Sequence, residues 1–371
     1  MHESEIVAQF LALARVPGTS RKERPIIDEL KAFLSRQRLD FEEDRSFEQF
    51  GGEAGNLICK VPGRGGRPLL LAAHVDTVSL SCKNPAVKDG RIVSTSDHVL
   101  GADDRVGVTV LVEILKRVAR KEIDFPPLEV VFFVAEEVGL LGSRFLDYSR
   151  LEARWGINFD CSAEVGRIVV RAPSTFDLLF RFHGRSAHSA VNPEAGVNAI
   201  AMAARAIGQL NLPQKEEETV FNLGTIRGGR GNNVIPDRVE VTGELRAFRQ
   251  EKIDHILQRV RNVGNRVAAQ MGGRFEFSYA PRYGSFSLNE ESEIFQVIAE
   301  ACKQCRIPFQ PIRYFAGSDA NNFNQRGIVS VNVGLGYREN HSPREYIRIA
   351  DLMKDVELGI RAVETAARWQ R

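Results

Sequence analysis

Acidic and histidine side chains stand at the ends of apolar segments at several places in the chain. These are His74 and Asp76 after LLLAA, Asp103 and Asp104 before a helical segment, Glu136 and Glu137 after VVFFVA, Asp160 after WGINF, and His341 shortly after IVSVNVGLG. Imidazole nitrogens and carboxylate oxygens are the ordinary ligands of zinc, and a catalytic zinc site leaves one position for water. The residue types therefore indicate a metal site able to act on water.

The spacing inside these groups suits complementary tasks. His74 and Asp76 are two positions apart, so on a strand their side chains point to the same side. His74 can then bind a metal while Asp76 fixes the orientation of its ring. Glu136 and Glu137 face different ways, so one can bind metal while the other takes a proton from water, and the residues alone leave open which. A single such pair is common on surfaces, but the full ordered set favours a site.

The elements that must position these residues alternate between apolar strands and helices. Strands are predicted at 56–61, 69–75, 128–135, 155–159, 312–315 and 328–333, and helices at 4–16, 20–38, 104–120, 293–305 and from 351. Ser20 and Glu23 form the pattern of a capping box at the start of the second helix. Continuous apolar strands between helices predict an α/β fold with a largely parallel mixed sheet. Ligand sites in such sheets lie at the carboxyl ends of the strands, where the candidate residues are.

A different pattern occupies the middle of the chain. Strands at 176–183, 220–226, 238–248 and 274–279 show more polar alternation, and helices are predicted at 197–210 and 251–271. We therefore expect a discontinuous catalytic domain of residues 1–173 and 286–371. Residues 174–285 would form an inserted α+β domain of the ferredoxin-like kind, acting as a lid or dimerisation domain.

Composition excludes several classes of protein. The 371 residues carry a formal net charge of +2, and basic residues form no stripe, which argues against nucleic-acid binding. No apolar stretch reaches the roughly 18 to 20 residues of a membrane span. We see no secretory signal, and the five cysteines are an odd number, so free thiols in the cytoplasm are expected. Cys302 and Cys305 have the spacing of a redox or zinc half-site, but we interpret them as small residues on an amphipathic helix.

The ordered motifs HVDTV, LGADDR, AEEVGLLGS, NFD, GRSAHSA, GGRGNNVIPD, GSDAN and HSPRE run along essentially the whole chain. Together they resemble the dizinc family of peptidase T, aminoacylase and carboxypeptidase-type enzymes. The GADD, AEE and GSDAN forms are most similar to the peptidase T-like branch.

This resemblance implies a role for each candidate residue. His74 would bind one zinc ion and His341 the other, Asp103 would bridge both, and Glu137 and Asp160 would complete the two ligand sets. Glu136 would be the general base and Asp76 the residue that orients His74. In the inserted domain, His188 would stabilise an oxyanion, often in the partner subunit, while Asn233 and Arg246 would contact substrate. The Asp103–Asp104 peptide bond would be cis.

The implied activity is hydrolysis of a peptide bond, by an aminopeptidase acting on short peptides such as tripeptides. Two Zn²⁺ ions per chain are expected, with Co²⁺ or Mn²⁺ as alternatives, and a homodimer through the inserted domain. An N-acyl-amino-acid deacylase or a metallocarboxypeptidase has the same catalytic residues and stays open. A catalytically silent peptide-binding protein is the alternative from another class.

Two features depart from the family pattern. Arg105 stands where a lysine is common, which keeps the charge, and the loop 79–98 differs from the peptidase T form. Loops of this kind line the substrate entrance, so the exact substrate stays open.

Overall fold

The computed structural model describes residues 2–210, 212 and 215–369. It divides into two compact units: unit 1 comprises Met1–Arg171 and Ser287–Arg371, and unit 2 comprises Ala172–Phe286. Unit 2 therefore begins two residues before the expected boundary at 173/174 and ends one residue after the expected boundary at 285/286. Across the described residues, no helix is long and apolar enough to cross a membrane.

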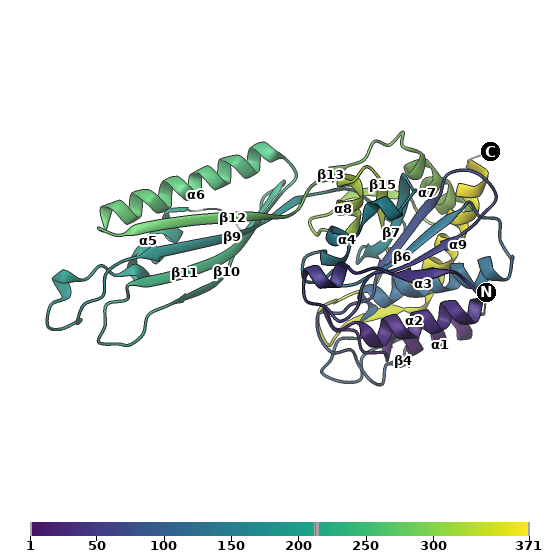
Figure 1. Cartoon of the computed structure of the whole chain (residues 1–371), viewed down its shortest axis with the longest axis horizontal. Coiled ribbons are helices and arrows are strands. Elements are labelled where there is room, and N and C mark those ends of the chain that lie inside the picture. The colour runs from purple at the N-terminus through teal and green to yellow at the C-terminus, as the bar shows by residue number, and fades with distance from the viewer. Residues whose placement is uncertain (1, 211, 213–214, 370–371) are drawn as a thin grey trace. The chain divides into compact units, whose positions relative to one another are not determined.

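Unit 1 is built around a nine-stranded mixed sheet (Figure 1). In sheet order its strands are β1 (Phe41–Glu43), β2 (Leu57–Val61), β6 (Leu128–Phe133), β3 (Leu69–His74), β7 (Trp155–Cys161), β15 (Val329–Gly334), β8 (Arg167–Ala172) and β13 (Phe286–Ser287), with β14 (Gln310–Arg313) paired to β8. The neighbours β6, β3, β7 and β15 are mutually parallel, whereas β1, β2 and β8 join the sheet through antiparallel pairs. The predicted largely parallel α/β sheet is therefore confirmed.

Helices cover both faces of this sheet. They are α1 (Glu3–Ala14), α2 (Arg24–Gln37), α3 (Ala102–Ala119), α4 (Leu141–Phe145), α7 (Glu293–Gln304), α8 (Asp319–Gln325) and α9 (Ile349–Trp369). Successive side chains of a strand point to opposite faces. Phe132 accordingly belongs to the main core with residues of α1, α3, α7 and α9, while the next residue, Phe133, packs on Phe323 of α8 with ring centroids 5.4 Å apart.

The parallel strands bring the candidate residues to one edge. β3 ends at His74, β6 ends three residues before Glu136, and β7 contains Asp160. Because adjacent strands lie about 4.8 Å apart, residues at neighbouring strand ends are within reach of a shared ion. A small sheet of β16 (Tyr346–Arg348), β5 (Arg91–Val93) and β4 (Ala86–Lys88) completes unit 1.

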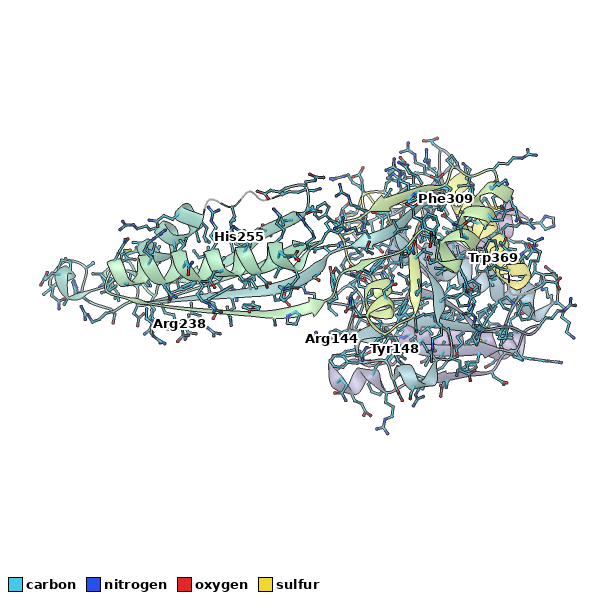
Figure 2. The ribbon with its side chains drawn as sticks, turned by 90° about the horizontal axis from the view of Figure 1, so that it is seen from above. Arg144, Tyr148, Arg238, His255, Phe309 and Trp369 are labelled. Carbon is cyan, nitrogen blue, oxygen red and sulfur yellow. The ribbon has the colours of Figure 1, made fainter. Side chains whose placement is uncertain are left out.

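Unit 2 has its own sheet and core. The antiparallel strands follow the order β10 (Thr219–Gly228), β11 (Arg238–Ala247), β9 (Ser174–His183) and β12 (Arg274–Tyr283). Helices α5 (Ala199–Leu210) and α6 (Gln250–Gln270) pack on this sheet through a separate apolar cluster, and the polar side of α6 carries the exposed His255 (Figure 2). The element order βαββαβ confirms the predicted ferredoxin-like α+β fold, while its role as a lid or dimerisation domain stays a prediction.

The predicted capping box at Ser20 is wrong. Helix α2 begins at Arg24, where Pro25 suits the first turn, and Glu23 makes no side-chain cap. Ser20 Oγ instead donates to Asp76 Oδ2 at 2.6 Å, and Glu23 Oε1 accepts from the amide of Ala135 at 3.0 Å. Buried partners from distant segments therefore replace the local hydrogen bonds that the pattern suggested.

A buried carboxyl group in α9 lies outside the candidate site. Asp355 is 1% exposed, and neither of its carboxyl oxygens has a hydrogen-bond partner among the described residues. Burial, together with the charge of Asp351, raises the pKa of Asp355 well above its ordinary value.

We expect Asp355→Asn to stabilise unit 1 at pH 8 or so and to lose this advantage toward about pH 4, the pKa of an unfolded aspartate. Above that pKa the unfolded chain releases a proton that folded Asp355 retains, so wild-type stability falls as the pH rises. Each unit of upward shift corresponds to about 1.4 kcal/mol. Urea unfolding followed by tryptophan fluorescence measures the effect, because Trp155 and Trp369 both lie in unit 1. A stability difference that is independent of pH would contradict this expectation.

Candidate active site

The first half of the site surrounds His74, which is 1% exposed. Its Nδ1 lies 3.1 Å from the carbonyl oxygen of Asp76 and 3.4 Å from Asp76 Oδ1. A carbonyl oxygen can only accept, so Nδ1 carries the proton and Nε2 presents its lone pair. Nε2 lies 3.1 Å from Asp103 Oδ1 and 3.6 Å from Asp160 Oδ1. This tautomer is the one required of a metal ligand.

The second half surrounds His341, whose side chain is 49% exposed. Its Nε2 lies 3.2 Å from Asp103 Oδ2 and 3.0 Å from Glu137 Oε1. Each oxygen of Asp103 therefore faces a different imidazole, as a bridging carboxylate must. His74 is thus shielded from solvent, whereas about half of the His341 side chain is accessible to it.

Two polar side chains hold the carboxylate of Asp103 in this orientation. Tyr337 donates its hydroxyl to Oδ1 at 3.1 Å, and Asn340 donates its amide to Oδ2 at 2.8 Å. On the backbone side, the carboxylate of Glu345 accepts from Gly101 N at 2.7 Å and from Asp103 N at 2.9 Å. Glu345 thereby connects the loop of Asp103 to the loop of His341. The Asp103–Asp104 peptide bond is cis, which confirms that expectation.

Asp76 contacts groups from both halves of the candidate site. It is fully buried, and its carboxylate accepts from the amides of Glu136 at 2.9 Å and Glu137 at 3.2 Å as well as from Ser20. Burial alone would raise its pKa, but the hydrogen bond and charge of His74 leave the pKa of Asp76 lowered. Asp76 thus positions His74 and the backbone of the two glutamates together.

The ionisation of the remaining groups shows strong repulsion between negative charges. Burial, followed by the charge of Asp103, raises the pKa of Glu137 to about 7. Burial and the charge of Asp160 raise the pKa of Glu136 well above its ordinary value. Contacts with Asp103 and Glu137 in turn raise the pKa of His341 to about 10. A buried carboxyl with a raised pKa beside such a cluster is suited to accept and return a proton.

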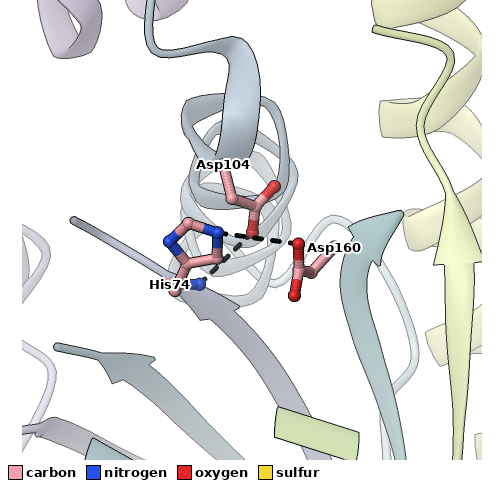
Figure 3. A group of neighbouring side chains, drawn as sticks. All are labelled: His74, Asp104 and Asp160. Atoms are coloured by element: carbon pink, nitrogen blue, oxygen red, sulfur yellow. Dashed lines mark hydrogen bonds and ion pairs between the residues drawn. The ribbon is translucent and has the colours of Figure 1, made fainter. Parts of the chain in front are cut away.

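The donor set fits divalent metal ions. Ligand atoms of His74, Asp103 and Glu137 lie within 4.8 Å of one another, as do those of His74, Asp104 and Asp160 (Figure 3). Among the described residues, the ion-pair partners of Asp103, Glu137 and Asp160 are the imidazoles of His74 and His341 and no lysine or arginine, so the cluster is one that could hold a divalent cation. Asp104 differs from the others, because its oxygens accept from the backbone amides of His74 and Gly107.

The structure thus brings seven predicted residues together in unit 1: His74, Asp76, Asp103, Glu136, Glu137, Asp160 and His341. The other three lie in unit 2. His188 and Asn233 are exposed on adjoining loops, where Ser189 N donates to the carbonyl of Asn233 at 3.0 Å. Arg246 on β11 forms a two-pronged ion pair with Glu244, at 3.1 and 3.0 Å.

Sequence reasoning missed the side chains that hold the ligands in place. Glu345 belongs to the quoted HSPRE motif, four positions after His341, and this spacing was the one available signal. Tyr337 and Asn340 lie in a loop with no recognisable pattern. Glu23 was interpreted as a local cap, although its partner is in another segment.

Comparison with known families gives two matches. The family model described as "Peptidase family M28" matches residues 56–223. The model described as "Peptidase dimerisation domain" matches residues 176–271. The first contains most of the strand ends described above, and the second falls within unit 2.

Similar proteins cover almost the entire chain. Uncharacterized protein YqjE of Bacillus subtilis (strain 168) is 31% identical over 370 residues, which is 99% of this chain and 100% of that protein. The structure of aminopeptidase PepT from Bacillus cereus ATCC 10987 has a TM-score of 0.90 and 31% identity. A tripeptidase from Staphylococcus aureus subsp. aureus Mu50 has a TM-score of 0.94 and 30% identity. Each structural comparison covers 99% of both chains.

The hydroxyl of Tyr337 offers a direct test of the bridging carboxylate. We expect Tyr337→Phe to weaken divalent-metal binding by about 10-fold or more, because loss of a hydrogen bond to a ligand loosens its orientation. Competition with a chromogenic chelator measures the dissociation constant. Tyr148→Phe is the matched control, since that hydroxyl donates to the carbonyl of Ser143 at 2.9 Å and contacts no candidate ligand. Equal dissociation constants for both variants would remove Tyr337 from this role.

Proposed function

Because the chain belongs to the peptidase T-like family of metallopeptidases, we propose that it is an aminopeptidase that hydrolyses short peptides such as tripeptides. The observation that carries this proposal is the pair of imidazoles facing opposite oxygens of Asp103, with a buried glutamate beside a candidate ligand. Such an arrangement serves two metal ions that share a carboxylate.

Two zinc ions are proposed per chain, with cobalt or manganese as alternatives. His74 and Asp160 would hold one ion and His341 and Glu137 the other, with Asp103 shared between them. When bound, such ions polarise an amide carbonyl and lower the pKa of water. Glu136 takes the proton from the attacking water and returns it to the leaving amine. Its buried position excludes competing bulk water from this transfer.

His188 is proposed to stabilise the oxyanion. Ala190 N donates to His188 Nδ1 at 3.2 Å, so in the neutral ring the proton resides on Nε2. Nε2 is then a hydrogen-bond donor, as oxyanion stabilisation requires. Asn233 lies on the adjoining loop and is proposed to contact substrate. Arg246 is proposed as an anchor for a substrate carboxylate, which would share its guanidinium with Glu244.

The same catalytic residues would serve a deacylase or a carboxypeptidase, so the alternatives differ in substrate and not in mechanism. A silent binding protein is disfavoured because Glu136 and all five candidate ligands are retained. The match of unit 2 to a dimerisation domain supports a homodimer, and the five free cysteines agree with a cytoplasmic location.

Hydrolysis of a substrate panel by metal-stripped and zinc-reloaded protein tests the proposal. The panel contains dipeptides, tripeptides, N-acetyl amino acids and C-terminally extended peptides, with products identified by mass spectrometry. Zinc-restored release of the N-terminal residue from tripeptides supports the aminopeptidase. Deacylation or C-terminal trimming would instead select a sister activity, and no turnover with metals bound would favour the binding protein.

Substitution of each of the two neighbouring glutamates should distinguish the general base from the metal ligand in this assay. We expect Glu136→Gln to bind both metals normally and to lose turnover by about 100-fold or more, because the amide cannot carry the proton. We expect Glu137→Gln to lose metal affinity first. Near-normal turnover in Glu136→Gln would remove Glu136 from the role of base.

Mixed dimers can test whether His188 serves the partner subunit. A chain with Glu136→Gln and a chain with His188→Ala should each be nearly inactive alone. If His188 acts across a two-fold dimer, random mixing restores about a quarter of wild-type activity, because half the dimers are mixed and one of their two sites is intact. No recovery after verified subunit exchange would place His188 at the site of its own chain.

A further inference from the structure

Four consecutive backbone amides lead from the end of β6 to the two site glutamates, and each donates to a side-chain oxygen. The pairs are Val134 N with Asn56 Oδ1 (3.3 Å), Ala135 N with Glu23 Oε1 (3.0 Å), Glu136 N with Asp76 Oδ1 (2.9 Å) and Glu137 N with Asp76 Oδ2 (3.2 Å). The three accepting side chains come from separate segments, before α2, before β2 and after β3. Distant parts of unit 1 thus converge on residues 134–137.

The carbonyl groups of the same segment are held as well. Val134 O accepts from Gly142 N at 3.1 Å, Ala135 O from Leu141 N at 3.0 Å, and Glu136 O from Leu140 N at 2.7 Å. Movement of this segment would therefore break several hydrogen bonds at once. Side-chain oxygens therefore accept from the amides of this segment, and the amides of the following turn, residues 140–142, donate to its carbonyl groups.

Ala135 is the conformationally demanding residue in this segment. Its φ is +52°, in the left-handed region that is unfavourable for a residue other than glycine. Such a conformation persists only where the surroundings enforce it. At Ala135 the chain turns out of the sheet, so its backbone angles set the direction in which the next side chain, Glu136, projects.

Glu23 holds the amide of Ala135 from a buried position. Its side chain is fully buried, and Oε1 also accepts from Arg21 N at 2.6 Å. Arg105 is fully buried too, and the charges of Asp76, Asp104 and Glu23 oppose the burial that lowers the pKa of Arg105 to about 10. An interior carboxyl is costly unless it is paired or hydrogen-bonded. The bonds to two amides meet this requirement for Oε1, whereas Oε2 has no hydrogen-bond partner among the described residues. Burial, followed by the charge of Asp76, accordingly raises the pKa of Glu23 to about 7.

We infer that Glu23 is a positioning residue for Glu136: its Oε1 holds the Ala135 amide and thereby fixes the direction of the Glu136 side chain. This inference rests on the proposed role of Glu136 as general base. Among the described residues Glu23 forms no hydrogen bond with a candidate metal ligand, and its direct link to the Glu136 segment is the bond to the Ala135 amide.

The substitutions Glu23→Ala and Glu23→Gln separate the hydrogen bond from the charge. Glu23→Ala removes the acceptor, and kcat should fall about 10- to 100-fold with KM nearly unchanged at saturating zinc, since small misplacements of a catalytic group have effects of this size. Glu23→Gln keeps an oxygen that can accept from Ala135 N, and kcat should stay within about 3-fold of wild type even where its melting temperature falls. A purely structural residue would lower stability in both variants without this rescue.

Glu129→Ala is the matched control. Glu129 is a buried glutamate on the same strand, β6, and its carboxylate also holds two successive amides, Glu152 N at 3.0 Å and Ala153 N at 2.9 Å. It lies near the opposite end of that strand. We expect this variant to lose stability while its kcat remains that of the wild type.

Hydrogen–deuterium exchange provides a readout that needs no activity. Glu23→Ala should accelerate exchange at residues 134–137 by about 10-fold or more, Glu23→Gln should not, and Glu129→Ala should accelerate exchange at 152–153 only. Wild-type kcat and unchanged exchange in Glu23→Ala would overturn the inference while the proposed function stands. If the wild-type protein hydrolyses nothing, the proposed function fails, and the role of Glu23 as a holder of the Glu136 segment is decided by exchange alone.

Discussion

Repulsion between buried carboxylates is the constraint on which the organisation of unit 1 depends. Burial, followed by the charges of neighbouring carboxylates, raises the pKa values of Glu136, Glu137 and Asp160. Burial would raise the pKa of Asp103 as well, but its contacts with His341 and His74 leave that pKa lowered. Isolated buried charges of this kind are too costly to persist unpaired. The surrounding structure therefore consists of hydrogen-bond donors, imidazoles and a place for cations.

The parallel sheet explains why these groups can converge at all. Four neighbouring strands run in the same direction, so their carboxyl ends form one edge, and each contributes a residue or the loop that carries it. Among the described residues, the carboxylates of Asp76 and Glu345 accept hydrogen bonds from backbone amides and form no ion pair with a lysine or arginine. Asp76 accepts from the amides of Glu136 and Glu137, and Glu345 accepts from those of Gly101 and Asp103, so backbone groups stabilise these two supporting carboxylates.

The parts of this arrangement that sequence reasoning could predict are those with a local signature. Strands buried on both faces appear as continuous apolar runs, so the positions of His74, Glu136 and Asp160 at their ends were visible. The supporting contacts were not, because Glu23 and Ala135 or Glu345 and Gly101 are far apart in the chain and only the fold makes them neighbours. The Ser20 pattern shows the same limit: a local capping box was chemically reasonable, but the buried carboxylate of Asp76 is the stronger partner for that hydroxyl.

The predicted site residues differ in their exposure to solvent, and this difference bears on the mechanism. His74, Asp76 and Asp103 are buried, whereas His188 and Asn233 are exposed on unit 2 and His341 is half-exposed. A hydrogen-bond donor in water contributes little to stabilising a developing charge, because the high dielectric constant weakens its field. Unit 1 can therefore hold metal ions and a base by itself, but effective action of His188 requires that water be excluded around it. On the proposed role of His188, a bound peptide or a second chain covering the loops at 188 and 233 would supply that exclusion, so substrate binding and completion of the site are expected to occur together.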